Sequence, residues 1–384
     1  MAASCVLAAN AVPGLGGQGR HLEDAIRALR GHFALSAFVR GRATTSPAGD
    51  PVPIAVVPRS RLARGIEAVP WLRRRRDWTV LADDAHFDGY TAARLPRTTL
   101  FHGASGQSLH SLRRAHAVGA RTVVDSLTVH VEDLDAAFRS ACAEFGVRSP
   151  LHPRQRERVL REYDEADLIR TMSQRARATF LEKGVPADRV VVTMPPFDIA
   201  AFPVARFDHD RFRVCFVGAL EPWKGFHHLL AAFSSLAERD AELVLYGGSG
   251  SRPVAQYLAQ HTGPATRSHV RPMSGYEEVY GSASVLVHPS LTEGFGLVVG
   301  EAMASGLPVV VSDRTGAADL VEDGRNGYVV AAGDVGAIRE RLAHLAQHPA
   351  LVREMGAAAR ETMRAYTPER FRAELVACLS TVLA

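Results

Sequence analysis

The sequence predicts an α/β fold with two domains, each built around a parallel sheet. Short apolar, β-branched runs bounded by Gly, Pro or Asp alternate with longer helical patterns along most of the chain, which is typical of βαβ units. At roughly 150 residues per domain, a length of 384 residues favours two domains. The interval 194–213 interrupts the alternation, because it is rich in Pro, Phe and Asp and follows neither period.

Two series of apolar runs give the expected strands. The first comprises residues 5–9, 34–39, 79–82, 99–102, 121–125, 168–171 and 190–193, and the second comprises residues 213–217, 242–246, 269–271, 285–288, 308–312 and 327–330. The last segment opens with Thr367-Pro368-Glu369, an N-cap, an N1 proline and a first-turn acid, so it predicts a closing helix. We therefore expect one domain over residues 1–205 plus the helix 367–384, and a second over 206–366.

The composition is that of a globular protein, with 47% hydrophobic and 22% charged residues, and excludes disordered, collagen-like and disulfide-rich chains. The four cysteines are far apart, as expected of reduced thiols in a cytosolic protein. The apolar N-terminus has no basic segment before it, which indicates a first strand rather than a signal peptide. No run reaches the ~18 apolar residues of a membrane helix. The formal charge of +4 is small and both signs are mixed, so we expect a cytoplasmic protein without a nucleic-acid partner.

The most informative segment carries two carboxylates, Glu293 and Glu301. On one continuous helix, this spacing would place them about 80° apart around the axis and ~12 Å along it. We therefore expect Glu293 in a loop and Glu301 in the second turn of a short helix that Gly306 ends. Gly294 and Gly296 would let backbone N–H groups approach an oxyanion at the positive end of that helix. The alternative is a plain surface helix with a favourable acid near its start, which the surrounding glycines and prolines disfavour.

This segment resembles the Glu-x7-Glu signature of the retaining nucleotide-sugar glycosyltransferases of family 4. The resemblance rests on Pro289-Ser290 and residues 293–309, and it extends to residues 162–167 and 216–218. It implies the GT-B fold, in which an acceptor-side domain and a donor domain face each other across a cleft. In that family Glu301 would hydrogen-bond the ribose, and Glu293 would face the hydroxyls and the reacting carbon of the donor sugar. The donor-binding residues of the same segment would be Gly294, Phe295, Gly296 and Leu297.

The resemblance implies transfer of a hexosyl-type group from a nucleoside diphosphate sugar to an acceptor hydroxyl, with retention and without a cofactor or required metal. UDP-sugars are the first expectation because the family uses them most often, and GDP-sugars are the second. The acceptor would be a small molecule, a glycan or a lipid-linked compound. In the family the leaving phosphate oxygen is thought to take the acceptor's proton on the same face of the sugar.

Lys224 is the second signal, because Lys183 is the only other lysine among 45 basic residues. It follows the expected strand 213–217 and precedes a helical pattern, so a compact ammonium at this junction is well placed to neutralise a diphosphate. A solvated surface lysine is the alternative. The resemblance matches Lys224 to the family's diphosphate-binding lysine. The family usually has an arginine five positions earlier, where this chain has Ala219, so part of the leaving-group stabilisation must come from elsewhere or activity is reduced.

A glycine-rich loop after the first strand supports a rival function. Gly14, Gly16 and Gly19 satisfy G-x-G-x-x-G before a helical pattern, as in dinucleotide-binding oxidoreductases. The second strand ends in residues 39–42, Val-Arg-Gly-Arg, which would require NADP rather than NAD. The family resemblance instead implies that the amides of Gly16 and Gly17 lie against the donor phosphate and sugar. A tight turn without a ligand is a third interpretation.

Further candidates come from strand ends and from the resemblance. His130 lies just past a strand's carboxyl end, where open α/β sheets bind ligands, and it matches the family's active-site histidine. His102 is the competing histidine. The resemblance also implies that Gly218 opens the donor domain beside the ligand, and that Arg271 and Met273 belong to a loop around the base.

Two other patterns are weaker. Residues 208–210, Asp-His-Asp, form a literal D-x-D, but they follow no apolar strand, so we interpret them as a solvated turn and expect no metal. The cluster Arg73–Arg76 between two tryptophans could rest weakly on the inner membrane face as a peripheral contact, with a solvated surface as the alternative. A catalytically impaired GT-B protein kept for binding is a third functional class, which Ala219 favours.

Overall fold

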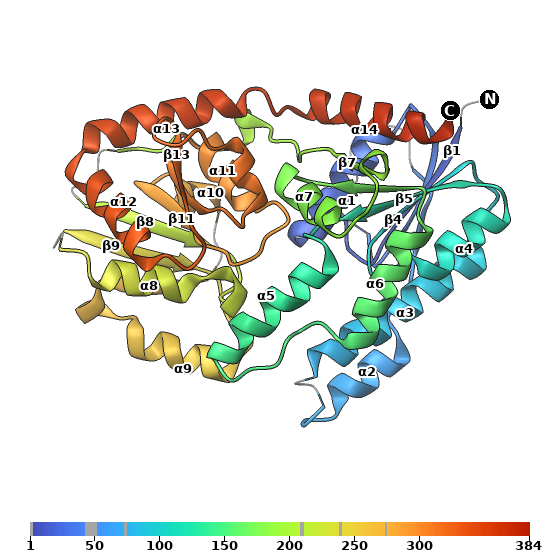
Figure 1. Cartoon of the computed structure of the whole chain (residues 1–384), viewed down its shortest axis with the longest axis horizontal. Coiled ribbons are helices and arrows are strands. Elements are labelled where there is room, and N and C mark those ends of the chain that lie inside the picture. Colours follow the sequence, from blue (N-terminus) through green and yellow to red (C-terminus); the bar gives the residue numbers. More distant parts are fainter. Residues whose placement is uncertain (1–2, 43–51, 73–74, 208–210, 238–239, 273–274) are drawn as a thin grey trace. The chain divides into compact units, whose positions relative to one another are not determined.

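The computed structural model describes residues 3–42, 52–72, 75–207, 211–237, 240–272 and 275–384. It divides into two compact units, which comprise residues 1–135, 149–196 and 368–384, and residues 136–148 and 197–367. Each unit holds one parallel sheet with its covering helices (Figure 1). The predicted α/β class with two Rossmann-like domains is therefore confirmed. Within the described residues, every helix is too short or too polar to cross a bilayer.

The first unit has a seven-stranded parallel sheet of order β3-β2-β1-β4-β5-β6-β7 among the described residues. Its strands are β1 (Ser4–Ala9), β2 (Ala34–Val39), β3 (Ile54–Val56), β4 (Leu100–Ala104), β5 (Arg121–Ser126), β6 (Leu168–Thr171) and β7 (Val190–Val192). The helices are α1 (Gly16–Leu29), α2 (Arg61–Ala68), α3 (Arg76–Arg94), α4 (Leu109–Ala117), α6 (Pro153–Glu165), α7 (Gln174–Glu182), η1 (Ala187–Arg189) and α14 (Pro368–Leu383).

Alternation along β1 gives this sheet two cores. Cys5 and Leu7 face a core shared with α1 and α14, whereas Val6 and Ala8 face a core shared with α3 and α4. Side chains of successive strand residues point to opposite faces, so a strand buried on both faces is apolar throughout. Helix α14 thus completes one face of the first sheet, next to α1 (Figure 1).

A network of buried charges crosses the middle of this sheet. Arg170 on β6, only 1% exposed, donates from Nε to Asp125 Oδ1 on β5 at 2.7 Å. His102 on β4 donates to the same oxygen at 2.6 Å, and His21 Nε2 of α1 lies 2.9 Å from Oδ2. Burial alone would raise the pKa of Asp125, but Arg170 and His102 hold it well below its usual value. The four side chains therefore tie α1 to three neighbouring strands.

The second unit has a six-stranded parallel sheet of order β10-β9-β8-β11-β12-β13 among the described residues. Its strands are β8 (Phe212–Val217), β9 (Ala241–Tyr246), β10 (Ser268–Arg271), β11 (Val285–His288), β12 (Val309–Ser312) and β13 (Gly327–Val330). Its helices are η2 (Ile199–Ala201), η3 (Pro222–Lys224), α8 (Phe226–Ser234), α9 (Arg252–His261), η4 (Pro264–Thr266), α10 (Tyr276–Tyr280), α11 (Leu297–Ala304), η5 (Gly316–Leu320), α12 (Val335–Gln347) and α13 (Pro349–Met363).

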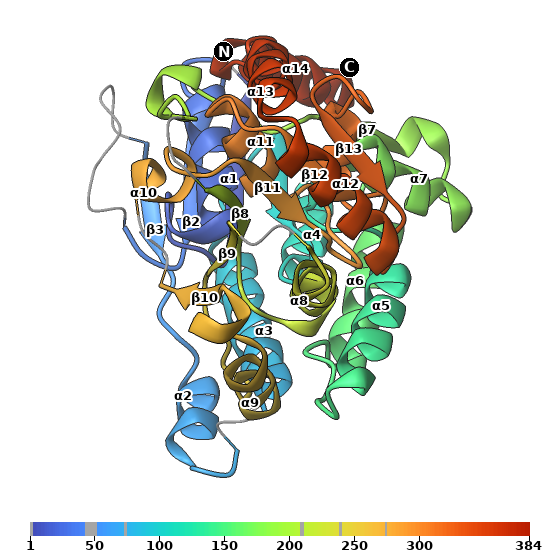
Figure 2. The ribbon, with the colours of Figure 1, turned by 90° about the vertical axis from the view of Figure 1, so that its left-hand side faces the viewer.

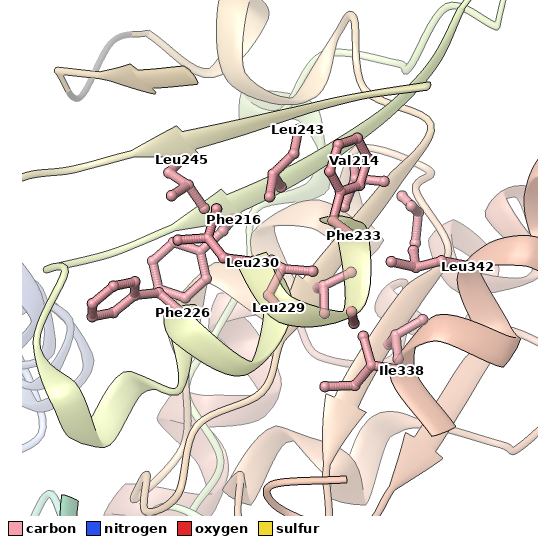
Figure 3. Close-up of a cluster of buried hydrophobic side chains, with 14 of the residues drawn as sticks. Val214, Phe216, Phe226, Leu229, Leu230, Phe233, Leu243, Leu245, Ile338 and Leu342 are labelled. Carbon is pink, nitrogen blue, oxygen red and sulfur yellow. The ribbon is translucent and has the colours of Figure 1, made fainter. Parts of the chain in front are cut away.

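Helix α8 covers one face of the second sheet. Its Phe226, Leu229 and Phe233 are fully buried, and they pack with side chains of β8 and β9 such as Phe216 and Leu243 (Figure 3). Helix α12 adds its own apolar side chains to this core and lies beside α8 (Figure 2). The buried stripe recurs every three or four residues, as expected of a helix with one apolar face.

One predicted strand was wrong and one strand was missed. Residues 79–82 lie inside α3, not in a strand. The inward face of α3 carries Asp84 and Asp88 together with Phe87 and Thr91, so its helical period is hidden from a search for apolar residues. The third strand is instead β3, a three-residue edge strand paired with β2. Pro53 immediately before it and Pro58 shortly after it disguise this strand, because proline is tolerated at sheet edges but not in central strands.

The boundary between the units also differs from the predicted break after residue 205. Phe197 already belongs to the second unit, because its amide donates to the Tyr366 carbonyl at 2.7 Å. Its ring fills the space over Gly300, where an added Cβ would lie 2.2 Å from the ring. Residues 136–148, the end of α5 (Val131–Glu144) and its loop, also group with the second unit through contacts such as Phe138 with Trp223. These aromatic contacts join segments that are distant in the sequence.

Replacing Asp125 with Asn should lower the free energy of unfolding by ~3–5 kcal/mol, because it leaves the buried Arg170 guanidinium without its counter-charge. The double variant Asp125→Asn/Arg170→Met should be more stable than Asp125→Asn alone, since it removes the stranded charge. Urea denaturation followed by circular dichroism measures both effects.

The control is Glu165→Gln, which breaks the partly exposed ion pair with Arg113 in the same unit. Exposed pairs contribute roughly 0–1 kcal/mol, so this variant should unfold almost like the wild type. Equal losses for Asp125→Asn and Glu165→Gln would contradict the role given to the buried network.

Candidate active site

Polar side chains of the second unit gather where the strand order of its sheet reverses. Strands β8 and β11 are neighbours in the sheet, although two strands separate them in the sequence. Their following loops therefore leave in opposite directions from adjacent carboxyl ends, which is the position at which open α/β sheets typically bind ligands. The loop after β8 carries Lys224, and the loop after β11 carries Glu293.

The two loops touch because Gly225 has no side chain. Its φ is +67°, and an added Cβ would lie 2.0 Å from the carbonyl oxygen of Pro289. The Leu291 amide also donates to the carbonyl of Trp223 at 2.8 Å, which joins η3 to the second loop. Gly225 is at the same time the N-cap of α8. The position of Lys224 is thus set by backbone contacts on both sides.

Glu293 is held by the backbone of a third loop. Its amide donates to the Arg314 carbonyl at 3.1 Å, and its own carbonyl accepts from the Gly316 amide at 3.1 Å. Gly296, with φ +92°, ends this stretch and caps α11. An added Cβ there would lie 3.2 Å from Thr315 and 3.3 Å from Glu293, so the turn is closely packed.

Lys224 and Glu293 form a direct ion pair through Nζ and Oε2, with side chains 21% and 19% exposed. Burial alone would raise the pKa of Glu293, but Lys224 and His288 lower it to about 2. His288 Nε2 lies 3.5 Å from the same oxygen and 3.2 Å from the Ser290 hydroxyl. A carboxylate that stays ionised beside a lysine is therefore available to a bound ligand.

His288 is a site residue that the sequence reasoning missed. It ends β11 and its ring stacks on Phe216, with centroids 6.1 Å apart and planes 15° apart. Burial lowers its pKa, and nearby Lys224 lowers it further against the opposing effect of Glu293, so the imidazole is neutral near pH 7. The signal was its place at the carboxyl end of a strand beside the reversal of strand order.

Glu301 lies in the second turn of α11, as predicted, and Gly306 ends that helix with φ +80°. Glu301 is only 2% exposed and accepts a hydrogen bond from the Tyr280 hydroxyl at 2.7 Å. The Phe295 ring is fully buried against Phe197, so this residue serves the packing of the loop through its side chain. The remaining predicted positions, Gly294 and Leu297, flank the start of α11.

Two other predicted donor-binding residues, Gly218 and Arg271, lie at the carboxyl ends of strands of the second sheet. Gly218 follows β8 with φ +144°, and its carbonyl lies so near Gly247 that an added Cβ there would be 1.9 Å away. Arg271 ends β10 and is half exposed, with its guanidinium 3.7 Å from Glu278. Met273 lies outside the described residues. Ala219 is exposed directly after Gly218.

The glycines of the loop before α1 in the first unit have different surroundings. Gly19 is a packing position, because an added Cβ would lie 2.1 Å from the Val12 carbonyl oxygen. Gly16 and Gly17 are exposed at the start of α1, with open space around them. Arg40, which the NADP interpretation needs, is already bound to Asn10 at 2.6 Å and lies 3.3 Å from the Asp83 carboxylate. The oxidoreductase alternative is therefore not favoured.

The two candidate histidines of the first unit have different surroundings. His102 belongs to the buried network around Asp125. His130 is 4% exposed and precedes α5, and its Nδ1 accepts from the Glu132 amide at 3.3 Å. Its ring packs between Tyr163 and Phe180, with centroids 5.4 and 5.1 Å away, and burial lowers its pKa. The catalytic role of His130 stays a prediction.

The weaker motifs add little to this picture. Arg73 and Arg74 lie outside the described residues, and so do residues 208–210 of the D-x-D sequence. Arg75 donates to Asp77 at 2.8 Å and lies over the Trp78 ring at 4.5 Å, so its charge is neutralised within the chain. Arg76 begins α3.

Comparisons with known proteins show similarity to glycosyl transferases. The family model for glycosyl transferases group 1 matches residues 199–362. The alpha-maltose-1-phosphate synthase of Mycolicibacterium smegmatis is 32% identical over 277 residues, which cover 68% of this chain and 67% of that protein. A D-inositol 3-phosphate glycosyltransferase of Streptomyces avermitilis is 36% identical over 214 residues, or 51% of this chain and 45% of that protein. The match thus spans less than half the length of this second relative.

Solved structures share the fold over nearly the whole chain. Anabaena HepE, solved in complex with UDP-glucose, has a TM-score of 0.74 and 17% identity, with 99% of this chain and 100% of that one covered. A sucrose-phosphate synthase from Thermosynechococcus elongatus has a TM-score of 0.73 and 19% identity, with 99% of each chain covered. The family model and the 32% identical relative, two thirds of which the chain covers, show that the chain belongs to the family of group 1 glycosyl transferases.

Proposed function

We propose that this protein transfers a hexosyl-type group from a nucleoside diphosphate sugar to an acceptor hydroxyl, with retention and without a required metal. UDP-sugars are the first donors to test and GDP-sugars the second. The observation that carries the proposal is the ion pair of Lys224 and Glu293 beside the reversal of strand order. HepE, which shares the fold, was solved with UDP-glucose, and this supports the choice of donor.

The ion pair explains how one site serves both halves of a donor. A diphosphate would compete with the Glu293 carboxylate for the Lys224 ammonium, and the N-terminal end of α11 favours an anionic group beside it. Once released, Glu293 is ionised and can accept hydrogen bonds from sugar hydroxyls. Fixed donors of this kind stabilise the charge that develops on a leaving diphosphate.

The remaining roles stay predictions from the family resemblance. Glu301 would bind the ribose through its carboxylate, whose Oε2 accepts a hydrogen bond from the Tyr280 hydroxyl. Gly16 and Gly17 of the first unit would contact the donor phosphate and sugar, and His130 of the same unit would contact the sugar. The leaving phosphate oxygen would accept the acceptor's proton, so no side chain is assigned as a base. Arg271 would border the base of the nucleotide.

Turnover separates the proposal from its alternatives. The purified protein should release UDP from at least one UDP-sugar, measured by chromatography over hours, because water can replace the acceptor hydroxyl as the attacking group when no acceptor is present. If UDP raises the thermal midpoint but no UDP- or GDP-sugar releases its nucleotide, with or without acceptors, the impaired binding protein is favoured. If NADPH raises the thermal midpoint and UDP does not, the oxidoreductase is favoured.

Replacing Lys224 with Ala should weaken UDP binding at least about tenfold, or ~1.4 kcal/mol, because the diphosphate loses its cation. Uridine binding should change less than about twofold, since the nucleoside has no phosphate. Isothermal titration calorimetry measures both ligands.

Lys183 offers the matched control. It is the other lysine of the chain and lies 3.4 Å from Asp133 in the first unit, so Lys183→Ala removes the same charge from a residue to which no donor contact is assigned. UDP binding should be unchanged in this variant. A similar loss of UDP and uridine affinity in Lys224→Ala would remove the assigned role of the lysine.

The Glu293 carboxylate should make stability depend on pH. Its pKa falls from 4.5 to about 2 on folding, so it stabilises the folded state above pH 4.5, and this stabilisation is lost as the pH falls toward 2. The difference in free energy of unfolding between wild type and Glu293→Gln should be constant above about pH 5.5 and shrink by roughly 1 kcal/mol per pH unit below 4.5. Urea denaturation at pH 7, 5, 4 and 3.5 measures this difference.

Glu322→Gln serves as the control for this series. Glu322 pairs with Arg325 within the second unit, and both side chains are more than half exposed. Its difference from wild type should stay near zero at every pH. A Glu293→Gln difference that does not shrink between pH 5 and 3.5 would show that Lys224 and His288 do not hold the carboxylate ionised.

A further inference from the structure

A second polar cluster lies at the start of α8, outside the residues assigned to donor binding. Glu144, His227 and His228 bring one oxygen and two nitrogens within 4.8 Å of one another. His227 Nε2 lies 3.2 Å from Glu144 Oε2, and the two imidazole centroids are 4.0 Å apart. All three residues belong to the second unit.

The histidines of this cluster lack partners that their burial demands. His227 is 8% exposed, yet neither of its ring nitrogens makes a hydrogen bond to any described residue, and the same holds for Nδ1 of His228. A neutral imidazole has one N–H and one lone pair to satisfy, and a buried polar group without a partner costs roughly 1–3 kcal/mol. The Nε2 of His227 approaches the carboxylate closely, but without the geometry of a hydrogen bond.

Neighbouring side chains hold His227 in this position. Its ring packs edge-on against Phe145 and Phe226, with centroids 5.1 and 5.4 Å away. Phe226 is anchored in the core under the sheet (Figure 3), so the next residue cannot turn freely into solvent. A neutral imidazole carries a lone pair on one ring nitrogen, which can bind a metal ion.

We propose that Glu144, His227 and His228 bind a divalent transition-metal ion, with Zn²⁺ as the ion that suits them best. Two imidazoles and one carboxylate form a donor set that zinc accepts, whereas Ca²⁺ and Mg²⁺ prefer oxygen ligands. The ion would provide the missing partner for the buried imidazole. Three protein ligands leave a position for water, as in zinc sites that are not closed by a fourth side chain.

The metal would stabilise the loop that carries Lys224. His227 and His228 follow Gly225, the N-cap of α8, within three residues, so an ion bound to them ties the first turn of α8 to Glu144. Since the proposed transfer has no required metal, we assign the ion to holding this loop and not to the reacting atoms. Its test is a binding measurement that does not depend on donor turnover.

One other histidine pair needs to be distinguished from this site. His344 and His348 lie one turn apart at the end of α12, exposed, with ring centroids 4.5 Å apart. Histidines at this spacing on a helix surface can chelate metal ions without a built site. His348 Nδ1 already donates to the His344 carbonyl at 2.7 Å, which leaves Nε2 of each ring for such binding.

The experiment titrates ZnCl₂ into the untagged, metal-free full chain by calorimetry, with four variants beside the wild type. Wild type and His344→Gln/His348→Gln should bind one Zn²⁺ with equal affinity. His228→Gln and Glu144→Gln should bind at least about tenfold more weakly, because each loses one of three ligands. Glu132→Gln changes a partly exposed carboxylate at the other end of α5, in the first unit, and this variant should bind as the wild type does.

Two outcomes would overturn the proposal. Unchanged zinc affinity in Glu144→Gln and His228→Gln would exclude the site, and loss of binding in His344→Gln/His348→Gln would assign the zinc to the exposed pair.

The thermal midpoint should rise with Zn²⁺ in the wild type and not in Glu144→Gln. Because the Glu144 side chain is about half exposed, its replacement should not disturb folding, so a missing rise would report lost zinc binding. Absorption of the Co²⁺-loaded protein gives a second readout, since nitrogen and oxygen ligation at low coordination number intensifies the visible bands.

Discussion

The reversal of strand order in the second parallel sheet decides where the polar groups of the candidate site meet. Parallel strands present all their carboxyl ends at one edge, and loops diverge only where neighbouring strands continue in opposite directions. In the second unit this point lies between β8 and β11, and Lys224, Glu293 and His288 meet there. No local propensity of their own segments would bring these three residues together.

The first sheet has the same kind of reversal, between β1 and β4, and uses its interior differently. Its ion pair of Arg170 on β6 and Asp125 on β5 is buried within the sheet, and the two residues are 1% and 6% exposed. A pair buried this deeply has exchanged water for mutual hydrogen bonds, and it resists a ligand. The Lys224–Glu293 pair is about one-fifth exposed, so a phosphate can replace one partner. Depth of burial thus separates an ion pair that stabilises from one that can bind.

Several close contacts between loops of the second unit are possible only because a glycine lies at the contact. Gly225 meets the Pro289 carbonyl, Gly300 meets the Phe197 ring and Gly296 ends a closely packed turn. Each marks a place where the backbone approaches another segment too closely for a Cβ. These contacts also explain why the segment from Phe197 belongs with the second unit, since its ring depends on the missing side chain of Gly300.

The sequence by itself determined the fold class, most strands, the loop position of Glu293 and the second-turn position of Glu301, because these follow from local periodicity and turn residues. It misassigned residues 79–82, since aspartates on the buried face of α3 hide the helical period. Only the tertiary structure decided that Lys224 contacts Glu293, that His288 joins them and that Glu144 meets His227. Those contacts join residues distant in the sequence or on different loops, and their distances depend on strand order and packing, which no local pattern contains.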